Sequence, residues 1–171
     1  YTPLQLATAI ATLANDGVMF RPHIVDFVED IRTRARTVVE PKPLRTLDVK
    51  PEHIRIVKDA LVGVNKEGTG RRAFAGAEYV SAGKTGTAQV IGMKQGEKYV
   101  ESRVAERFRD HSLFIAYAPA EKPRIALAVI VENAGFGARA AAPIARLVLD
   151  YYLLGKQPAR AAKEDEDAAR H

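Results

Sequence analysis

The chain has 171 residues, of which 47% are hydrophobic and 27% charged, a composition typical of one globular domain with its own core. It contains no cysteine, which excludes disulfides and cysteine nucleophiles. Its net charge of +5 suits an anionic partner, but no nucleic-acid-binding motif and no interleaved aromatic side chains accompany the basic residues. We therefore expect no nucleic-acid partner.

The first predicted element is a helix at the N-terminus. Thr2 and Gln5 have the spacing of a capping box, and Pro3 suits the first helical position. The Asn-Asp-Gly sequence at 15–17 ends this helix. Because the chain begins at Tyr1, directly on a helix-start signal, we expect it to be a piece of a longer protein.

Short strands or extended chain are expected over 18–40, followed by an irregular connection that includes Pro43. A second helix, with apolar residues at helical spacing, is predicted from Pro51 and ends by Gly68. The stretch 32–45 is rich in positive charge, and we expect it to form a solvated basic flap. Its basic residues are Arg32, Arg34, Arg36, Lys42 and Arg45.

The second half is predicted to contain three strands, at 81–90, 113–118 and 125–131, and a helix that ends at Gly155. The last strand is apolar on both faces, so helices are expected to cover both of its sides. The polar connection at 93–111 is long, and connections of this length are usually functional or mobile. We predict an α+β fold in which three adjacent antiparallel strands are packed by helices.

Two segments are predicted to lack regular structure. Gly68–Arg72 is expected to be a loop because it holds two glycines in five residues. The segment 156–171 consists largely of alanine and charged residues, and with so little apolar surface to bury it is expected to be a disordered tail.

The most unusual stretch is 81–90. Gly83-Lys84-Thr85 matches the end of a phosphate-binding P-loop, but position 78, where the first glycine of that motif would stand, is Glu78, and no helix follows. Ser81 and Lys84 match a Ser-x-x-Lys nucleophile, but residues three apart on a strand point to opposite faces. We reject both interpretations.

The four residues Lys84-Thr85-Gly86-Thr87 suggest a carboxylate-binding site on a strand. The lysine supplies positive charge, the two threonine hydroxyls donate hydrogen bonds, and the glycine keeps the strand face clear. Free N–H groups at a strand edge suit an oxyanion. The alternative is a glycine-containing edge strand with an exposed lysine and no ligand.

This Lys-Thr-Gly strand resembles that of the transpeptidase domain of class B penicillin-binding proteins. The similarity extends to Tyr1–Leu6, to 15–17, to Ala116-Tyr117-Ala118-Pro119 and to Val131-Glu132-Asn133. Ala105–His111 looks like the corresponding segment of the penicillin-binding protein 2 branch. The resemblance covers about residues 1–155, and it implies the penicillin-binding/serine β-lactamase-like fold, with 1–155 as the C-terminal part of a transpeptidase domain.

The resemblance implies serine acyl transfer that cross-links peptidoglycan stem peptides and is blocked by β-lactams. Lys84, Thr85, Gly86 and Thr87 would bind the substrate, with the Thr87 backbone N–H as one oxyanion donor. The family's Ser-x-x-Lys and Ser-x-Asn would lie before Tyr1, so we expect no catalytic residue in this chain and no activity of the chain alone.

The same resemblance implies a periplasmic domain of a parent protein anchored in the bacterial inner membrane, with proteins of the cell-elongation machinery as partners. The alternative hypothesis is a non-catalytic penicillin-binding sensor or scaffold module. We expect no cofactor, and no metal, because no two histidines have metal-ligand spacing. The histidines are His23, His53, His111 and His171.

Overall fold

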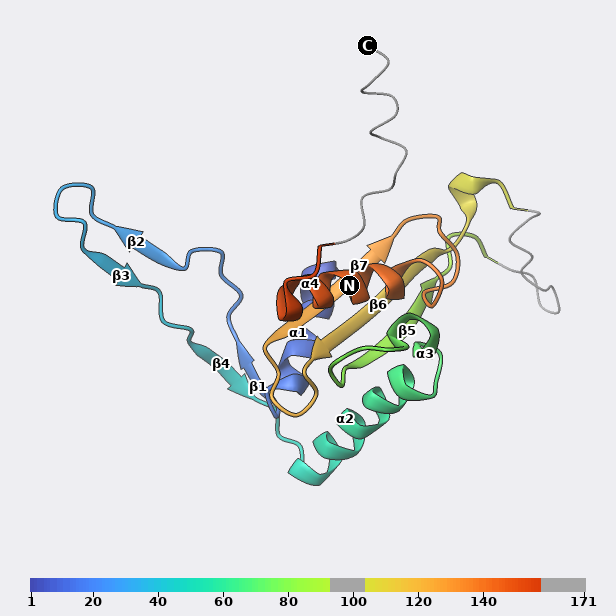
Figure 1. The fold of residues 1–171 in the computed structure, drawn as a ribbon, viewed down its shortest axis with the longest axis horizontal. Helices are drawn as coiled ribbons and strands as arrows, with labels where there is room; N and C mark the ends of the chain where they lie inside the picture. The colour runs from blue at the N-terminus through green and yellow to red at the C-terminus, as the bar shows by residue number, and fades with distance from the viewer. Residues whose placement is uncertain (93–103, 158–171) are drawn as a thin grey trace, which may run out of the picture.

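The computed structural model describes residues 1–92 and 104–157. A three-stranded antiparallel sheet lies at its centre (Figure 1). Its strands, in spatial order, are β5 (Ala82–Ala88), β6 (His111–Ala118) and β7 (Ile125–Val131). The predicted α+β fold with three antiparallel strands is confirmed, although β6 begins two residues earlier than expected. Most of the predicted connection 93–111 and of the predicted tail 156–171 lies outside the described residues.

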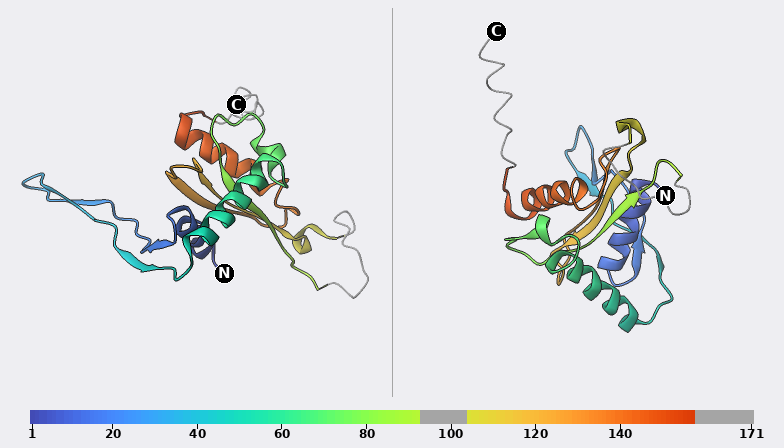
Figure 2. Two further views of the ribbon diagram at one scale, coloured as in Figure 1. Left: turned by 90° about the horizontal axis from the view of Figure 1, so that it is seen from below. Right: turned by 90° about the vertical axis from the view of Figure 1, so that its right-hand side faces the viewer.

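Helices cover both faces of the sheet (Figure 2). They are α1 (Pro3–Ala14), α2 (Pro51–Lys66), α3 (Arg71–Phe74) and α4 (Ala141–Leu154). The capping box predicted for α1 is present, with Thr2 and Gln5 exchanging hydrogen bonds. Because α1 packs on one face of β7 and α4 on the other, the prediction that this strand is covered on both sides is confirmed.

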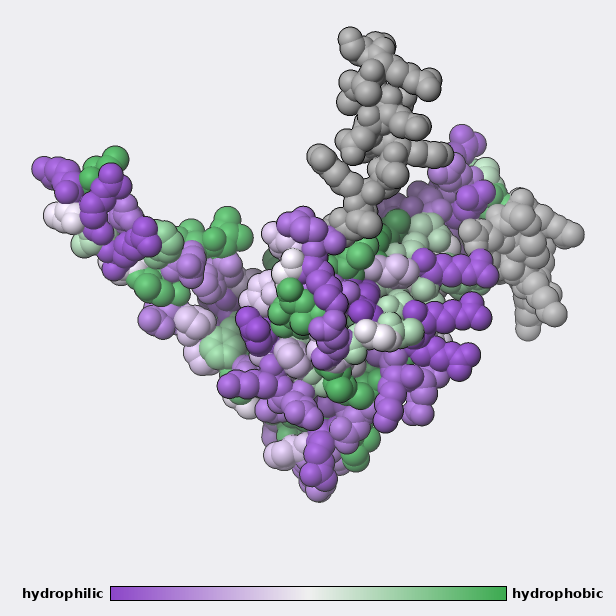
Figure 3. Space-filling view, viewed as in Figure 1, coloured by the Kyte–Doolittle hydropathy of each residue, from purple (hydrophilic) through white to green (hydrophobic). Residues whose placement is uncertain are grey.

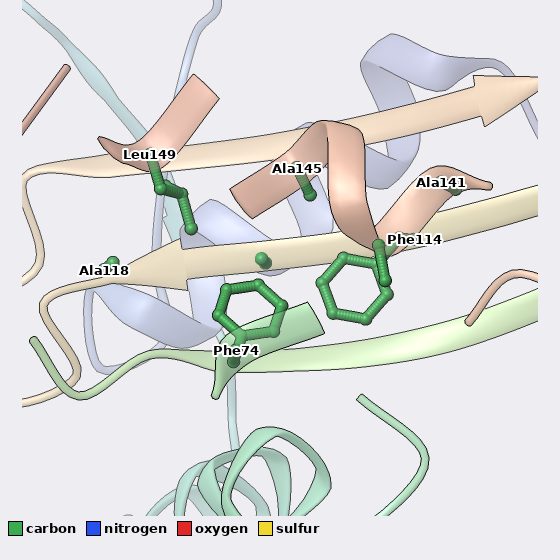
Figure 4. Packing of buried hydrophobic residues seen from close by; sticks show 8 residues of the cluster. Phe74, Phe114, Ala118, Ala141, Ala145 and Leu149 are labelled. Carbon is green, nitrogen blue, oxygen red and sulfur yellow. The ribbon is translucent and has the colours of Figure 1, made fainter. Parts of the chain in front are cut away.

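The core between the sheet, α3 and α4 is built from aromatic rings and alanines (Figure 4). Phe74 stacks on Phe114, with ring centroids 5.6 Å apart. Small side chains on β6 and α4, including Ala116 and Ala145, allow the helix to approach the strand closely. Leu149 fills the remaining space. These contacts hold β6, the strand that pairs with β5.

The opposite face of the sheet is covered by α1 and α2. Ile10 and Ala14 of α1 and Leu61 of α2 form one buried cluster with Ala82 of β5 and Tyr117 of β6. Each face therefore has its own core, and β5 is held by helix contacts at its first residue. Burial of these residues provides the largest favourable term for docking the helices on the sheet.

The residues between α1 and α2 form an arm that extends away from the sheet (Figures 1 and 3). Its four strands pair as β1 (Val18–Phe20) with β4 (Pro43–Thr46), and β2 (Phe27–Glu29) with β3 (Arg36–Val38).

Charged and apolar side chains are interspersed along this arm (Figure 3). Arg34 and Arg36 both bind the carboxylate of Glu29, while Ile24 and Ile31 are almost fully exposed. The predicted basic flap is therefore exposed as expected. Pro43, however, lies in a strand and not in an irregular connection, as its first residue, where a missing N–H is tolerated.

Two short helices were not predicted. Arg71 and Arg72, expected in a loop, begin α3, and residues Glu106–Phe108 form a 3-10 helix, η2. A single turn has no periodic pattern to reveal it, and α3 is stabilised by the burial of Phe74 against the sheet. Within the residues that the structure describes, no helix is both long and apolar enough to cross a membrane.

Candidate substrate-binding site

The predicted site residues lie on β5, at the edge of the sheet. The strand pairs with β6 along its whole length, with Lys84 opposite Ile115 and Thr85 opposite Phe114, and no described strand pairs with its outer side. Side chains alternate along a strand, so Lys84 lies on the face of α1 and α2, whereas Thr85 and Thr87 lie on the face of α4. At an edge strand, both faces are accessible from the same open side.

The described part of this site is electropositive. Lys84 is exposed, and no carboxylate within residues 1–92 and 104–157 pairs with it. Its ammonium group instead donates to the carbonyl oxygen of Thr85, with Nζ and O 2.9 Å apart. Thr87 is exposed and Thr85 half-buried. The open edge of β5 therefore offers a carboxylate an unneutralised cation and two hydroxyl donors.

Two hydrogen bonds connect β5 to the end of α2 and the loop that follows it. Asn65 Nδ2 donates to Ser81 Oγ at 2.9 Å, just before the strand begins. Thr69 Oγ1 lies 2.9 Å from Thr85 Oγ1. The sequence predicts only a loop at Gly68–Arg72, and no local pattern indicates that Thr69 contacts β5.

The two described serines have structural roles. Ser81 is buried and bound by Asn65. Ser112, opposite Thr87 in the sheet, is fully buried, and its Oγ accepts from the N–H of Ala141 at the start of α4. Neither hydroxyl is exposed for attack on a substrate, which agrees with the rejection of Ser81 as a nucleophile.

A glycine loop supports the back of the site. The backbone of Gly137 passes so close to Gly86 that a Cβ on Gly137 would collide with the carbonyl oxygens of Gly86 and Leu113. This loop is anchored to β6, where Asn133 N–H donates to His111 Nδ1 at 3.0 Å. No local sequence pattern indicates that this loop lies against the Lys-Thr-Gly strand.

A polar cluster fixes the segment that leads into β5. The Tyr79 hydroxyl and Arg146 Nε each donate to Asp150 Oδ1 at 2.7 Å, and Arg146 also donates to the carbonyl of Ala75. Burial opposes ionisation of Asp150, but the bonds from Arg146 and Tyr79 outweigh it, and the pKa of this carboxyl lies below its ordinary value. Burial and the neighbouring carboxylate raise the pKa of Tyr79.

We found no group of three or more histidine, aspartate or glutamate side chains that could hold a metal ion in the described ranges 1–92 and 104–157. The open edge of β5 carries lysine, hydroxyl and backbone N–H groups. They suit recognition of an anion by charge and hydrogen bonds.

The chain is similar to known cell-wall proteins. A family model for the penicillin-binding protein transpeptidase domain matches residues 1–150. The peptidoglycan D,D-transpeptidase MrdA of Haemophilus influenzae is 41% identical over 92% of this chain, and that of Escherichia coli K12 is 38% identical over 96% of it. These matches cover 24% and 27% of the relatives, so the chain spans about a quarter of their length.

Solved structures of penicillin-binding proteins are also similar to this chain. Penicillin-binding protein 2 of Pseudomonas aeruginosa, in complex with WCK 5153, is 35% identical with a TM-score of 0.69, over 95% of this chain and 32% of that one. Penicillin-binding protein A of Mycobacterium tuberculosis, as an imipenem acyl-enzyme, is 31% identical with a TM-score of 0.69, over 90% of this chain and 31% of that one. The chain therefore belongs to the penicillin-binding protein transpeptidase domain family.

Proposed function

We propose that residues 1–155 are the C-terminal part of the catalytic domain of a peptidoglycan D,D-transpeptidase. The observation that carries this proposal is the Lys84-Thr85-Gly86-Thr87 segment on the open edge of β5, with a lysine that pairs with no carboxylate in the described part of the chain. Membership of the transpeptidase domain family supports it.

The reaction is acyl transfer in two steps. A serine Oγ attacks the carbonyl carbon of the penultimate D-alanine of a stem peptide, and the terminal D-alanine leaves as an amine that takes a proton. The amine of a neighbouring stem peptide then attacks the acyl-enzyme, forms the cross-link and returns the serine hydroxyl. A β-lactam acylates the same serine. In this proposal the serine is supplied by sequence that precedes Tyr1.

The residues of β5 bind and orient the donor peptide. Lys84, Thr85 and Thr87 hold the terminal carboxylate, and Gly86 leaves room for the peptide backbone. The Thr87 N–H stabilises the oxyanion of the tetrahedral intermediate, a contribution of about 3 kcal/mol for a typical donor. Because the Ser-x-x-Lys and Ser-x-Asn motifs of the family are not in this chain, the 171-residue chain alone is proposed to have no activity.

The parent protein is proposed to be a periplasmic enzyme anchored in the inner membrane, with stem peptides and β-lactams as ligands and proteins of cell elongation as partners. The similarity to relatives named peptidoglycan D,D-transpeptidase MrdA supports the substrate class. The location and the elongation partners follow from the resemblance to the penicillin-binding protein 2 branch.

The test is the acylation rate of the full-length parent by a labelled penicillin. Lys84→Ala is expected to slow acylation about 10- to 100-fold, since a hydrogen bond to a charged group contributes about 1.5–3 kcal/mol. Lys122→Ala, at an exposed lysine in the β6–β7 turn, is the matched control and should leave the rate unchanged.

The 171-residue chain should show no penicillin adduct by intact mass. A stable adduct on this chain would contradict its proposed inactivity. A full-length parent that takes up no penicillin would contradict the proposed enzyme.

A further inference from the structure

Thr69 is the only described residue outside β5 whose side chain is hydrogen-bonded to the side chain of a proposed carboxylate ligand. It lies in the short loop between α2 and α3, 16 residues before Thr85 in sequence, and its hydroxyl oxygen is 2.9 Å from that of Thr85. Thr69 is exposed, so its hydroxyl does not need the Thr85 hydroxyl as a substitute for water.

The loop that carries Thr69 is held in place by its backbone. Gly68 N–H donates to the carbonyl of Gly63, and Gly70 N–H to that of Val64, both at 2.9 Å. A Cβ on Gly68 would lie 2.9 Å from the Val64 Cα, and one on Gly70 would lie 2.5 Å from Asn65 Oδ1. A side chain at position 68 would collide with the α2 backbone and one at position 70 would displace the Asn65 side chain, so the loop packs closely against the last turn of α2 on either side of Thr69.

The same turn of α2 is also connected to the residue that precedes β5. Asn65 is buried and donates to Ser81 Oγ at 2.9 Å, so α2 and its loop make one contact just before the strand and another at Thr85. The position of the Thr69 hydroxyl relative to β5 is thus determined by two contacts and not by the loop alone.

The chemistry of a carboxylate ligand determines the direction of the hydrogen bond between the two threonines. A hydroxyl has one proton to donate and two lone pairs, whereas an ionised carboxylate only accepts. If Thr85 donates its proton to the ligand, its oxygen is free to accept from Thr69. The result is a chain from the Thr69 hydroxyl to the Thr85 hydroxyl to the carboxylate, and hydrogen bonds in such a chain strengthen one another.

We propose that Thr69 is a positioning residue of the substrate-binding site, which donates to Thr85 Oγ1 and so directs the Thr85 proton toward the carboxylate of the donor peptide or β-lactam. This inference rests on the proposed function, because it requires a ligand carboxylate at Thr85. It adds a residue from outside the Lys-Thr-Gly strand to the binding of that carboxylate.

The test compares acylation rates of the full-length parent and its variants with a labelled penicillin. Thr69→Val keeps the shape of the side chain and removes the hydroxyl, and it is expected to slow acylation about three- to tenfold, the effect of one neutral hydrogen bond. Thr69→Ser keeps the hydroxyl and should restore most of the rate. Thr37→Val, at an exposed threonine of the arm, is the matched control and should have no effect.

A double-mutant cycle separates positioning from a merely structural role. If Thr69 acts through Thr85, then adding Thr69→Val to Thr85→Val should cause little further loss, because the hydroxyl that Thr69 directs is already absent. The thermal unfolding midpoint of each variant is measured in parallel and should stay at the wild-type value for Thr69→Val.

The outcomes are distinguishable. A wild-type parent that is not acylated contradicts the proposed function, and this inference with it. An acylated wild type whose rate is unchanged by Thr69→Val contradicts this inference alone. Additive losses in the cycle, or a loss that Thr69→Ser does not restore, also contradict it, because they would show that Thr69 acts independently of Thr85 or through packing.

Discussion

Gly137 determines how closely the loop before α4 can approach the Lys-Thr-Gly strand. A side chain at this position would collide with the carbonyl oxygens of Gly86 and Leu113, which belong to paired strands. These are backbone atoms, so a collision cannot be relieved by a rotamer change. At Gly86 the contact is less severe, since a Cβ there would lie 3.2 Å from the Leu113 Cβ of the neighbouring strand.

Gly137→Ala is expected to lower the free energy of unfolding by about 2 kcal/mol, since overpacking forces the backbone to move. Displacement of β5 should also slow penicillin acylation of the parent. Urea unfolding measures the first effect. Gly92→Ala is the control, because nothing lies within 4 Å of a Cβ at Gly92, and it should change stability by less than about 0.5 kcal/mol. Equal effects of the two substitutions would contradict the prediction.

At the scale of elements, α4 holds the segment before β5 through one carboxylate. Asp150 and Arg146 each keep only 15% of their side-chain surface exposed, and the Tyr79 hydroxyl donates to the same Asp150 oxygen as Arg146. The pKa of Asp150 is lowered in the folded state. Its stabilising contribution is therefore fully present above the unfolded-state pKa of about 3.9 and is lost as the pH falls through the lower folded-state pKa.

Asp150→Asn is expected to lower the free energy of unfolding by about 1–3 kcal/mol at pH 7, because Arg146 and Tyr79 lose a charged acceptor. The difference in the free energy of unfolding between wild type and variant should shrink below pH 3.9, where the protonated carboxyl of Asp150 resembles the amide of asparagine. Urea unfolding from pH 7 to pH 2.5 measures both effects. Asp59→Asn, at an exposed position of α2, is the control. A difference that does not depend on pH would contradict this account.

At the scale of the whole molecule, the sheet and the arm are separate packing units. β2 and β3 pack mainly on each other, whereas β1 packs on α1. The outer part of the arm, residues 22–41, begins and ends at neighbouring points, since Arg21 N–H donates to the carbonyl of Lys42 at 3.2 Å.

Replacing residues 22–41 by Asn-Gly should therefore leave the core intact. The two residues would close β1 and β4 as a hairpin, for which Asn-Gly is the favoured turn. The thermal unfolding midpoint is expected to remain within about 2 °C of the wild type, because the removed strands are largely exposed and pack mainly on each other. A lower midpoint would show that the arm stabilises the domain.

The sequence alone determined the elements whose signals are local. The capping box at Thr2, the two-faced apolar pattern of 125–131 and the residue types of Lys84–Thr87 each depend on neighbours within a few positions, and the helix and strands that they predicted are present. The assignment of those four residues to a substrate carboxylate remains a proposal.

Only the tertiary structure decided what surrounds that strand. Thr69 lies 16 residues from Thr85, and the Tyr79–Asp150 pair joins residues 71 apart. Gly137 contacts Gly86, which is 51 residues away in sequence. No local pattern encodes these contacts, because they form only when two helices and a loop pack around the same edge strand. The types of binding group could be predicted from the sequence, but their positioning depends on residues that the fold brings together.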